Sequence, residues 1–239
     1  MQNRFLKIAL AAVGLLFLLN SSHAQPSTDV LAKADSLFSL KKYTQSLELY
    51  SELFRGKKYS PAMLLRMAFI EEGLAHYANT LYYLSLYYQH TFDRAAMEKI
   101  QQLAATHRFT GYEQSDLDRM ANAWRRYGHR VTLVLAGLAL LLTVALVLYK
   151  RKPIKTAVGI SQLVVLLLLL IHLNFPFAKK GIIDNGITYL MTGPSAGASV
   201  VGKIGEGHCV TMLDKTDVWV KIRWENKEVF VRESNLKPL

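Results

Sequence analysis

The chain has 239 residues, of which 51% are hydrophobic, a mean hydropathy of +0.14 and a formal net charge of +11. This composition excludes intrinsic disorder and collagen, and the single cysteine excludes a disulfide scaffold. The apolar excess is concentrated in three stretches, residues 5–19, 131–148 and 157–173, which argues against a soluble cytosolic enzyme.

The positive charge does not indicate nucleic-acid binding. It amounts to +2 in residues 1–24, +3 in 25–130, +4 in 150–155 and +2 in 178–239. The densest cluster therefore lies between two apolar stretches, where it is a signal of membrane topology. Neither remaining segment has the basic stripe that phosphate binding requires, so we expect no nucleic-acid partner.

Residues 1–24 have the features of a secretory signal peptide. Arg4 and Lys7 precede an apolar core, and Ser22 and Ala24 are small residues at positions −3 and −1 of a cleavage site. We expect cleavage after Ala24; an uncleaved N-terminal anchor would give the same orientation. Either way, the domain that follows is exported.

Residues 27–130 are expected to form a helical repeat domain. At an offset of 34 residues, Ala34 aligns with Ala68, and Tyr43 with Tyr77. This is the period of tetratricopeptide repeats, and residues 40–47 and 73–81 resemble the turn between that repeat's two helices. Because such pairs do not bury their faces alone, residues 94–107 and 116–129 are expected to add a third pair. The last of these helices is expected to run into the first membrane span.

The resemblance implies a surface that binds extended segments of other proteins, on the first helix of each pair. The repeat register assigns to it Leu31, Phe38, Leu65, Arg66, Phe69 and Glu72. We interpret this surface as an apolar groove for a partner helix or tail. An alternative is that Leu65 and Phe69 pack into the third helical pair.

Residues 131–149 and 156–177 are expected to be two transmembrane helices, because each contains an uncharged run long enough to cross the bilayer. Residues 150–155 form a short loop whose positive charge indicates that it lies in the cytoplasm. Both flanking domains then lie on the outer side. We interpret His172, near the outer end of the second span, as an inter-helix hydrogen-bonding group or interfacial anchor rather than part of a proton path.

Residues 181–239 change to a period of two, which is typical of strands. The expected strands are residues 187–190, 200–204, 209–213, 218–224 and 229–231, and five strands in so short a segment predict a small all-β barrel. The stretches 189–195, 201–204 and 219–222 resemble bacterial SH3-like (SH3b) domains. The resemblance marks as key positions Tyr189, Gly193, Pro194, Trp219 and Phe230, with Trp219 in the barrel core.

The sequence offers no catalytic constellation. Cys209 is expected to be a buried, inert thiol, because its neighbour His208 points to the opposite face of a strand. No metal-ligand spacing, phosphate loop or paired carboxylate is evident, so we expect no enzymatic activity, cofactor or metal.

The order of these parts, together with residues 67–74, 81–88 and 107–113, resembles BatE-type proteins of the Bacteroides aerotolerance (Bat) operon. The resemblance implies a bacterial inner-membrane protein with two periplasmic domains. It also implies von Willebrand A-type Bat membrane proteins and a MoxR-type AAA ATPase as partners, in aerotolerance or envelope stress. The alternative function is a cell-wall anchor whose SH3b-like domain binds peptidoglycan.

Overall fold

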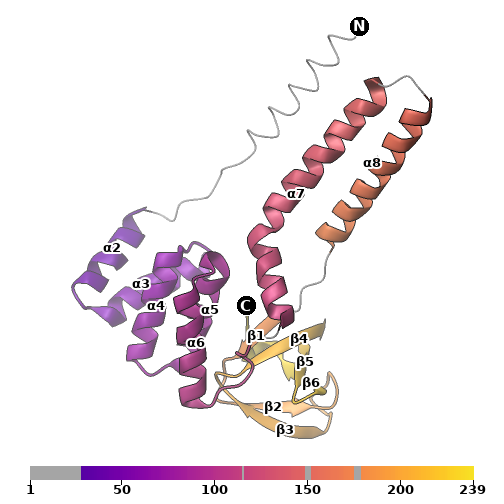
Figure 1. Cartoon of the computed structure of the whole chain (residues 1–239). Helices are drawn as coiled ribbons and strands as arrows, with labels where there is room; N and C mark the ends of the chain where they lie inside the picture. The colour runs from indigo at the N-terminus through magenta and orange to yellow at the C-terminus, as the bar shows by residue number, and fades with distance from the viewer. Residues whose placement is uncertain (1–27, 115, 149–151, 175–178) are drawn as a thin grey trace. The chain divides into compact units, whose positions relative to one another are not determined.

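The computed structural model describes residues 28–114, 116–148, 152–174 and 179–239 (Figure 1). The predicted signal peptide lies outside the described residues. The chain divides into two compact units, and the boundary between them falls after Met63. The fold combines helices, two of which are candidate membrane spans, with a C-terminal antiparallel sheet.

The first unit contains helices α2 (Thr28–Ser39) and α3 (Tyr43–Arg55), which pack against each other. Small buried side chains allow their close approach. The Ser46 hydroxyl donates a hydrogen bond of 2.9 Å to the carbonyl oxygen of Ala34, and both residues are fully buried. One turn further on, the Tyr50 hydroxyl donates to the Asp35 carboxylate at 2.6 Å. These bonds fix the register of the two helices.

Helix α4 (Pro61–Gly73) contains the boundary between the units, and α5 (Tyr77–Thr91) and α6 (Arg94–His107) follow it. The bounds of α6 are those predicted from the sequence. The buried Glu71 carboxylate joins the end of α4 to the start of α5, because it is 2.8 Å from His76 Nδ1 and accepts a 3.1 Å bond from the Asn79 amide.

The turn after α2 and the turn after α4 have the same backbone geometry, 34 residues apart. Lys41 and Ala75 both have positive φ, 58° and 61°. The amide of Lys41 donates to the carbonyl of Phe38, and that of Ala75 donates to the carbonyl of Glu72. The next amide in each turn donates to a carbonyl five residues earlier. The turns that follow α3 and α6, at Lys57 and Arg108, have the same geometry, so it is a common ending of these helices and is not specific to the 34-residue offset.

Helices α7 (Asp116–Leu148) and α8 (Lys152–Leu173) lie side by side, and each is long and apolar enough to cross a membrane (Figure 1). As predicted, α7 runs without a break from its polar first turns into the apolar stretch. Helix α8 begins at Lys152, so residues 152–155 of the predicted basic loop are helical. Pro153 lies in the first turn of α8, where its missing N–H has no helical partner to lose.

Two polar contacts join the helices of this hairpin. His172 Nε2 is 3.1 Å from the carbonyl oxygen of Gly128 and 3.0 Å from the hydroxyl of Thr132. Since the carbonyl only accepts, Nε2 carries the proton and donates it. Nearer the connection between the two helices, the Gln162 amide donates to the Thr143 hydroxyl at 3.1 Å. The predicted inter-helix role of His172 is the one that the geometry supports.

The C-terminal part is a seven-stranded antiparallel sheet in the order β3-β2-β6-β5-β4-β1-β7. Its strands are β1 (Lys179–Ile183), β2 (Ile187–Met191), β3 (Val200–Gly205), β4 (Cys209–Thr216), β5 (Trp219–Trp224), β6 (Lys227–Arg232) and β7 (Leu236–Pro238). The five strands predicted from the sequence are present, and β1 and β7 are additional.

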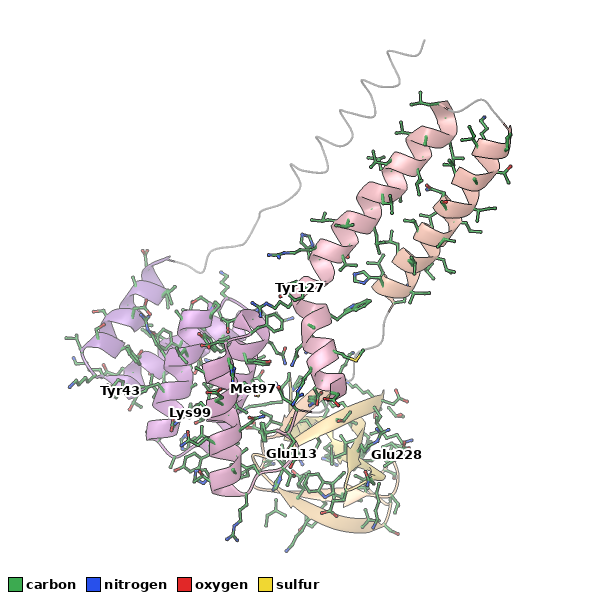
Figure 2. All side chains as sticks on the ribbon, in the orientation of Figure 1. Tyr43, Met97, Lys99, Glu113, Tyr127 and Glu228 are labelled. Carbon is green, nitrogen blue, oxygen red and sulfur yellow. The ribbon has the colours of Figure 1, made fainter. Side chains whose placement is uncertain are left out.

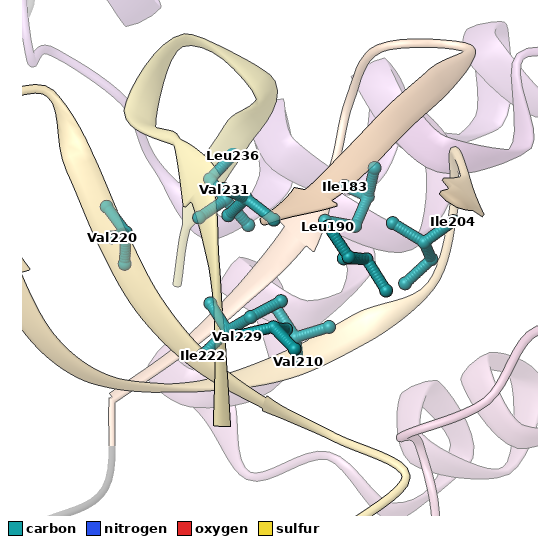
Figure 3. Packing of buried hydrophobic residues seen from close by; sticks show 9 residues of the cluster. All are labelled: Ile183, Leu190, Ile204, Val210, Val220, Ile222, Val229, Val231 and Leu236. Atoms are coloured by element: carbon teal, nitrogen blue, oxygen red, sulfur yellow. The ribbon is translucent and has the colours of Figure 1, made fainter. Parts of the chain in front are cut away.

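Aliphatic side chains from across the sheet form its core (Figure 3). Its members are Ile183, Leu190, Ile204, Val210, Val220, Ile222, Val229, Val231 and Leu236. Burial of this apolar surface, at about 25 cal/mol per Å², is the main force that holds so small a sheet together.

Candidate functional sites

The predicted groove residues divide between the two compact units. In the first, Leu31 and Phe38 are half-buried, and the Phe38 ring lies edge-on to Tyr43 at 5.4 Å between ring centroids. On α4, Leu65 and Phe69 are 44% and 55% exposed and lie one turn apart. This exposure argues against their burial in the helical core, which was the alternative.

The two charged members of the predicted groove differ in their surroundings from the apolar ones. Arg66 is half-buried. The Glu72 carboxylate forms an ion pair of 2.6 Å with Lys99 of α6. Glu72 therefore holds α4 to α6, and Leu65 and Phe69 are the members of the set best placed to contact a partner.

In the sheet, Tyr189 is 61% exposed on the outer face of β2, on the same face as the exposed Ile187. Pro194 is exposed and Gly193 half-buried in the loop between β2 and β3. Phe230 is half-buried and pairs in register with Met191. The key positions predicted for this domain thus do not converge on one pocket.

Trp219 is buried, as predicted, with 8% of its surface exposed, but it is not a member of the central cluster. Neighbouring strand residues point to opposite faces, and Val220 and Ile222 supply the cluster from β5. The indole ring therefore lies on the other face of β5, where the Arg232 guanidinium is 5.6 Å from its centre. Trp219 is therefore a buried core residue that lies beside the central aliphatic cluster and not within it.

The segment between α6 and α7 binds to the sheet. The carbonyl of Thr110 accepts a 3.0 Å hydrogen bond from the amide of Cys209, and the amide of Thr110 donates to His208 Nδ1 at 3.1 Å. The buried Tyr112 hydroxyl donates to the carbonyl of Gly207 at 2.7 Å. We call residues 109–112 the docking segment, because these bonds tie the helices to the sheet across about a hundred residues of sequence.

Two glycines make this approach possible. Gly111 has φ +89°, and a Cβ there would lie 1.9 Å from the carbonyl oxygen of Cys209. Gly207 has φ +86°, and a Cβ there would lie 2.7 Å from the ring of Phe109. Both positions favour glycine by conformation; a Cβ at Gly111 would require the backbone to move, and one at Gly207 would displace the Phe109 ring.

A series of aromatic rings continues the contact from the helices to the sheet. Tyr77 of α5 stacks on His107 of α6 at 3.6 Å, and His107 is 5.8 Å from Phe109. Phe109 and Trp224 both lie edge-on to His208, at 5.7 and 5.2 Å between ring centroids. The docking segment is thereby held on both sides by ring packing.

Burial changes the acid–base properties of this region. It raises the pKa of the Cys209 thiol to about 11 and raises the pKa of the Tyr112 hydroxyl well above its usual value. It also lowers the pKa of His208. The thiol is therefore protonated and buried, as expected for an inert cysteine. The neutral His208 ring matches its role as an acceptor from Thr110.

A cavity of about 110 Å³ lies between α5, α7 and the docking segment. A space of this size is large enough to hold several water molecules. The Gln114 and Asn122 amides both approach the Tyr88 hydroxyl, at 3.3 and 3.4 Å, and Asp118 pairs with Lys180 at 2.9 Å. These polar groups satisfy one another, and we assign no ligand to the cavity.

Comparison of the chain with protein-family models, with curated proteins and with solved structures found no match. Functional assignment therefore depends on the residues and geometry described above. The docking segment is the feature that the sequence reasoning missed. Its signal was Gly111 between Phe109 and Tyr112, a glycine among aromatic residues, but nothing local indicates a partner near residue 208.

Proposed function

We propose that this chain is a non-enzymatic inner-membrane scaffold of the BatE type. It presents a tetratricopeptide-like domain and an SH3b-like domain to the periplasm. Through them it binds von Willebrand A-type Bat membrane proteins and a MoxR-type AAA ATPase system. In this role the hairpin places the protein in the membrane, and the exported domains select its partners.

The structural observation that supports placing both domains on the same side is the docking segment. It precedes the hairpin, and the sheet residues that it contacts follow the hairpin. Since the two candidate spans return the chain to the side where it started, the contact requires both domains on one side of the membrane. Lys180 at the start of the sheet and Asp118 at the start of α7 form a further ion pair across the same two ends.

Two other findings support the domain types. Helices α2 and α3 pack against each other as a pair, which agrees with a helical repeat of the tetratricopeptide kind. The small antiparallel sheet with a single aliphatic core agrees with an SH3b-like barrel.

Cysteine labelling tests the topology. In a Cys209→Ser background, a cysteine at Lys152 should resist a membrane-impermeant thiol reagent in intact spheroplasts, and one at Asn226 should react. Asn226 is exposed in the turn between β5 and β6. Labelling of position 152 without labelling of position 226 would contradict the periplasmic placement.

Affinity purification from membranes tests the scaffold role. Replacing Leu65 and Phe69 by glutamate puts two charges on the exposed face of α4, and desolvating them against an apolar partner would cost several kcal/mol. A loss of about 3 kcal/mol reduces affinity more than a hundredfold. The matched control carries glutamate at Leu40 and Leu74, two exposed leucines in the recurring turns.

We expect the α4 variant to reach the membrane, remain helical and lose its partners, while the control keeps them. Equal recovery of partners by both variants would show that α4 is not the binding surface. Sedimentation with purified sacculi distinguishes the scaffold from the alternative function, a cell-wall anchor. Binding to the sacculi that depends on the sheet domain would favour the anchor.

A further inference from the structure

The outward face of α7 changes from basic to apolar at the point where the helix enters the membrane. Residues at intervals of three, four or seven share one face of a helix. One such series contains Arg126, Arg130, Leu133, Gly137, Leu141 and Leu148. Its two arginines and four leucine or glycine positions are all exposed, and the described residues leave open space around Gly137.

The opposite face of α7 is the one that meets α8. Gly128 and Thr132 contact His172, and Thr143 contacts Gln162. Arg126 and Arg130 therefore point away from the second helix of the hairpin. In Figure 2 the side chains that project from α7 beyond Tyr127 are mostly carbon, as a surface in contact with lipid chains requires.

The length of the helix places these arginines at headgroup level. About 20 helical residues cross a hydrocarbon core of about 30 Å. Counted back from Leu148, such a stretch begins at about residue 129, so Arg130 lies at the boundary and Arg126 one turn outside it. Tyr127 lies between them, at the depth where aromatic residues are enriched.

Ring contacts hold both guanidinium groups in place without using up their donors. The Arg126 guanidinium is 5.7 Å from the centre of the Tyr127 ring and 5.9 Å from that of Phe92, and the Arg130 guanidinium is 5.9 Å from Tyr127. Among the described residues, neither arginine forms an ion pair with a carboxylate. A guanidinium stacked on a ring keeps its N–H groups available for bidentate bonds to phosphate.

We propose that Arg126, Arg130 and Tyr127 form a binding site for the headgroup of an anionic phospholipid, whose acyl chains lie along Leu133, Gly137 and Leu141. This inference goes beyond the scaffold function and requires only that α7 and α8 span a membrane. It also explains why Arg126 and Arg130 lie at the outer end of the hairpin. Positive charge there works against the excess of positive charge in the cytoplasmic loop, which orients the two helices in the membrane.

Lipid binding by the full-length protein in detergent micelles tests the site. Bound phosphatidylglycerol and phosphatidylcholine with the same acyl chains are counted by native mass spectrometry. We expect phosphatidylglycerol to bind more tightly, and Arg126→Gln with Arg130→Gln to reduce that preference roughly thirtyfold, which corresponds to about 1 kcal/mol for each basic residue at a membrane surface. Arg126→Lys with Arg130→Lys should retain most of the preference, because the charge remains.

The matched control removes the same two charges elsewhere, through Lys203→Gln and Lys227→Gln on the exposed surface of the sheet, and should leave the preference unchanged. Circular dichroism should be the same for all variants. Equal affinity of the natural chain for both lipids, or an unchanged preference in the Arg126→Gln, Arg130→Gln variant, would overturn the proposal. Glycerol phosphate has no acyl chains, and the proposal would also fail if it displaced bound phosphatidylglycerol as well as phosphatidylglycerol itself does. It would fail likewise if a photo-crosslinker at position 137 reacted in native membranes with protein and not with lipid.

Discussion

Replacing Gly111 by alanine should release the docking segment from the sheet. At φ +89°, a residue with a Cβ costs about 1–2 kcal/mol. The new Cβ would also lie 1.9 Å from the carbonyl oxygen of Cys209, a backbone atom that has no rotamer with which to move away. The backbone strain alone, at about 1–2 kcal/mol, destabilises the docked state and raises the undocked population roughly fivefold to thirtyfold. The clash with the carbonyl oxygen of Cys209 acts in the same direction.

Cys209 reports on this change directly, because it is the only cysteine in the chain and its thiol is buried. The measurement is the rate at which a soluble maleimide labels the full-length protein in detergent. We expect slow labelling of the natural chain and an increase of the same order as the undocked population in Gly111→Ala. Gly186→Ala is the matched control, since a Cβ on Gly186 would meet no atom within 4 Å and its φ is not positive.

Tryptophan fluorescence shows whether the sheet remains folded in both variants. An unchanged labelling rate in Gly111→Ala would mean that the docking segment is not what protects Cys209. The reasoning from the close approach of Gly111 would then be refuted.

Two further predictions concern the sheet and its contact with the docking segment. Trp219→Ala should lower the free energy of unfolding of the sheet by about 3 kcal/mol. This is the lower end of the range for a buried tryptophan, because the ring lies outside the central cluster and beside Arg232. Calorimetry of the full chain in detergent measures the change, and an unchanged unfolding midpoint would contradict it. Burial lowers the pKa of His208, so the undocked ring takes up a proton at higher pH than the docked ring. Docking is therefore strongest above about pH 6.5 and weakens as the pH falls below that value. The test divides the Cys209 labelling rate of the natural chain by that of the His208→Gln variant at each pH. This ratio should rise as the pH falls below about 6.5, and a constant ratio would exclude the effect.

The helices could be predicted well because their signals are local. Apolar spacing and flanking polar residues located α6 at the residues where it lies, Arg94–His107, and the stripe of α7 continued into an uncharged run. Strands β1 and β7 had no comparable signal. Lys179–Ile183 begins with two lysines and a glycine, and Leu236–Pro238 has only three residues. They exist as strands because they pair with each other and because β1 pairs with β4, which is a tertiary effect.

Trp219 shows that a strand can bury side chains on both of its faces. In residues 218–224 the apolar residues Val218, Val220, Ile222 and Trp224 alternate with Trp219, Lys221 and Arg223. The alternation alone assigns the even positions to the core, and the sheet has Val220 and Ile222 there. The ring of Trp219 is nevertheless buried, and the Arg232 guanidinium lies 5.6 Å from its centre.

The docking segment was beyond local reasoning because its partners are about a hundred residues away, on the other side of the hairpin. Thr110 precedes α7 and His208 follows β3, so neither has its partner until α7 and α8 have brought the chain back. Closing so long a loop has an entropic cost that two hydrogen bonds alone do not offset, and the antiparallel packing of α7 on α8 removes most of it. Contact between the helices and the sheet should therefore depend on correct formation of the hairpin. The packing of α7 on α8 is thereby coupled to the contact between the docking segment and the sheet.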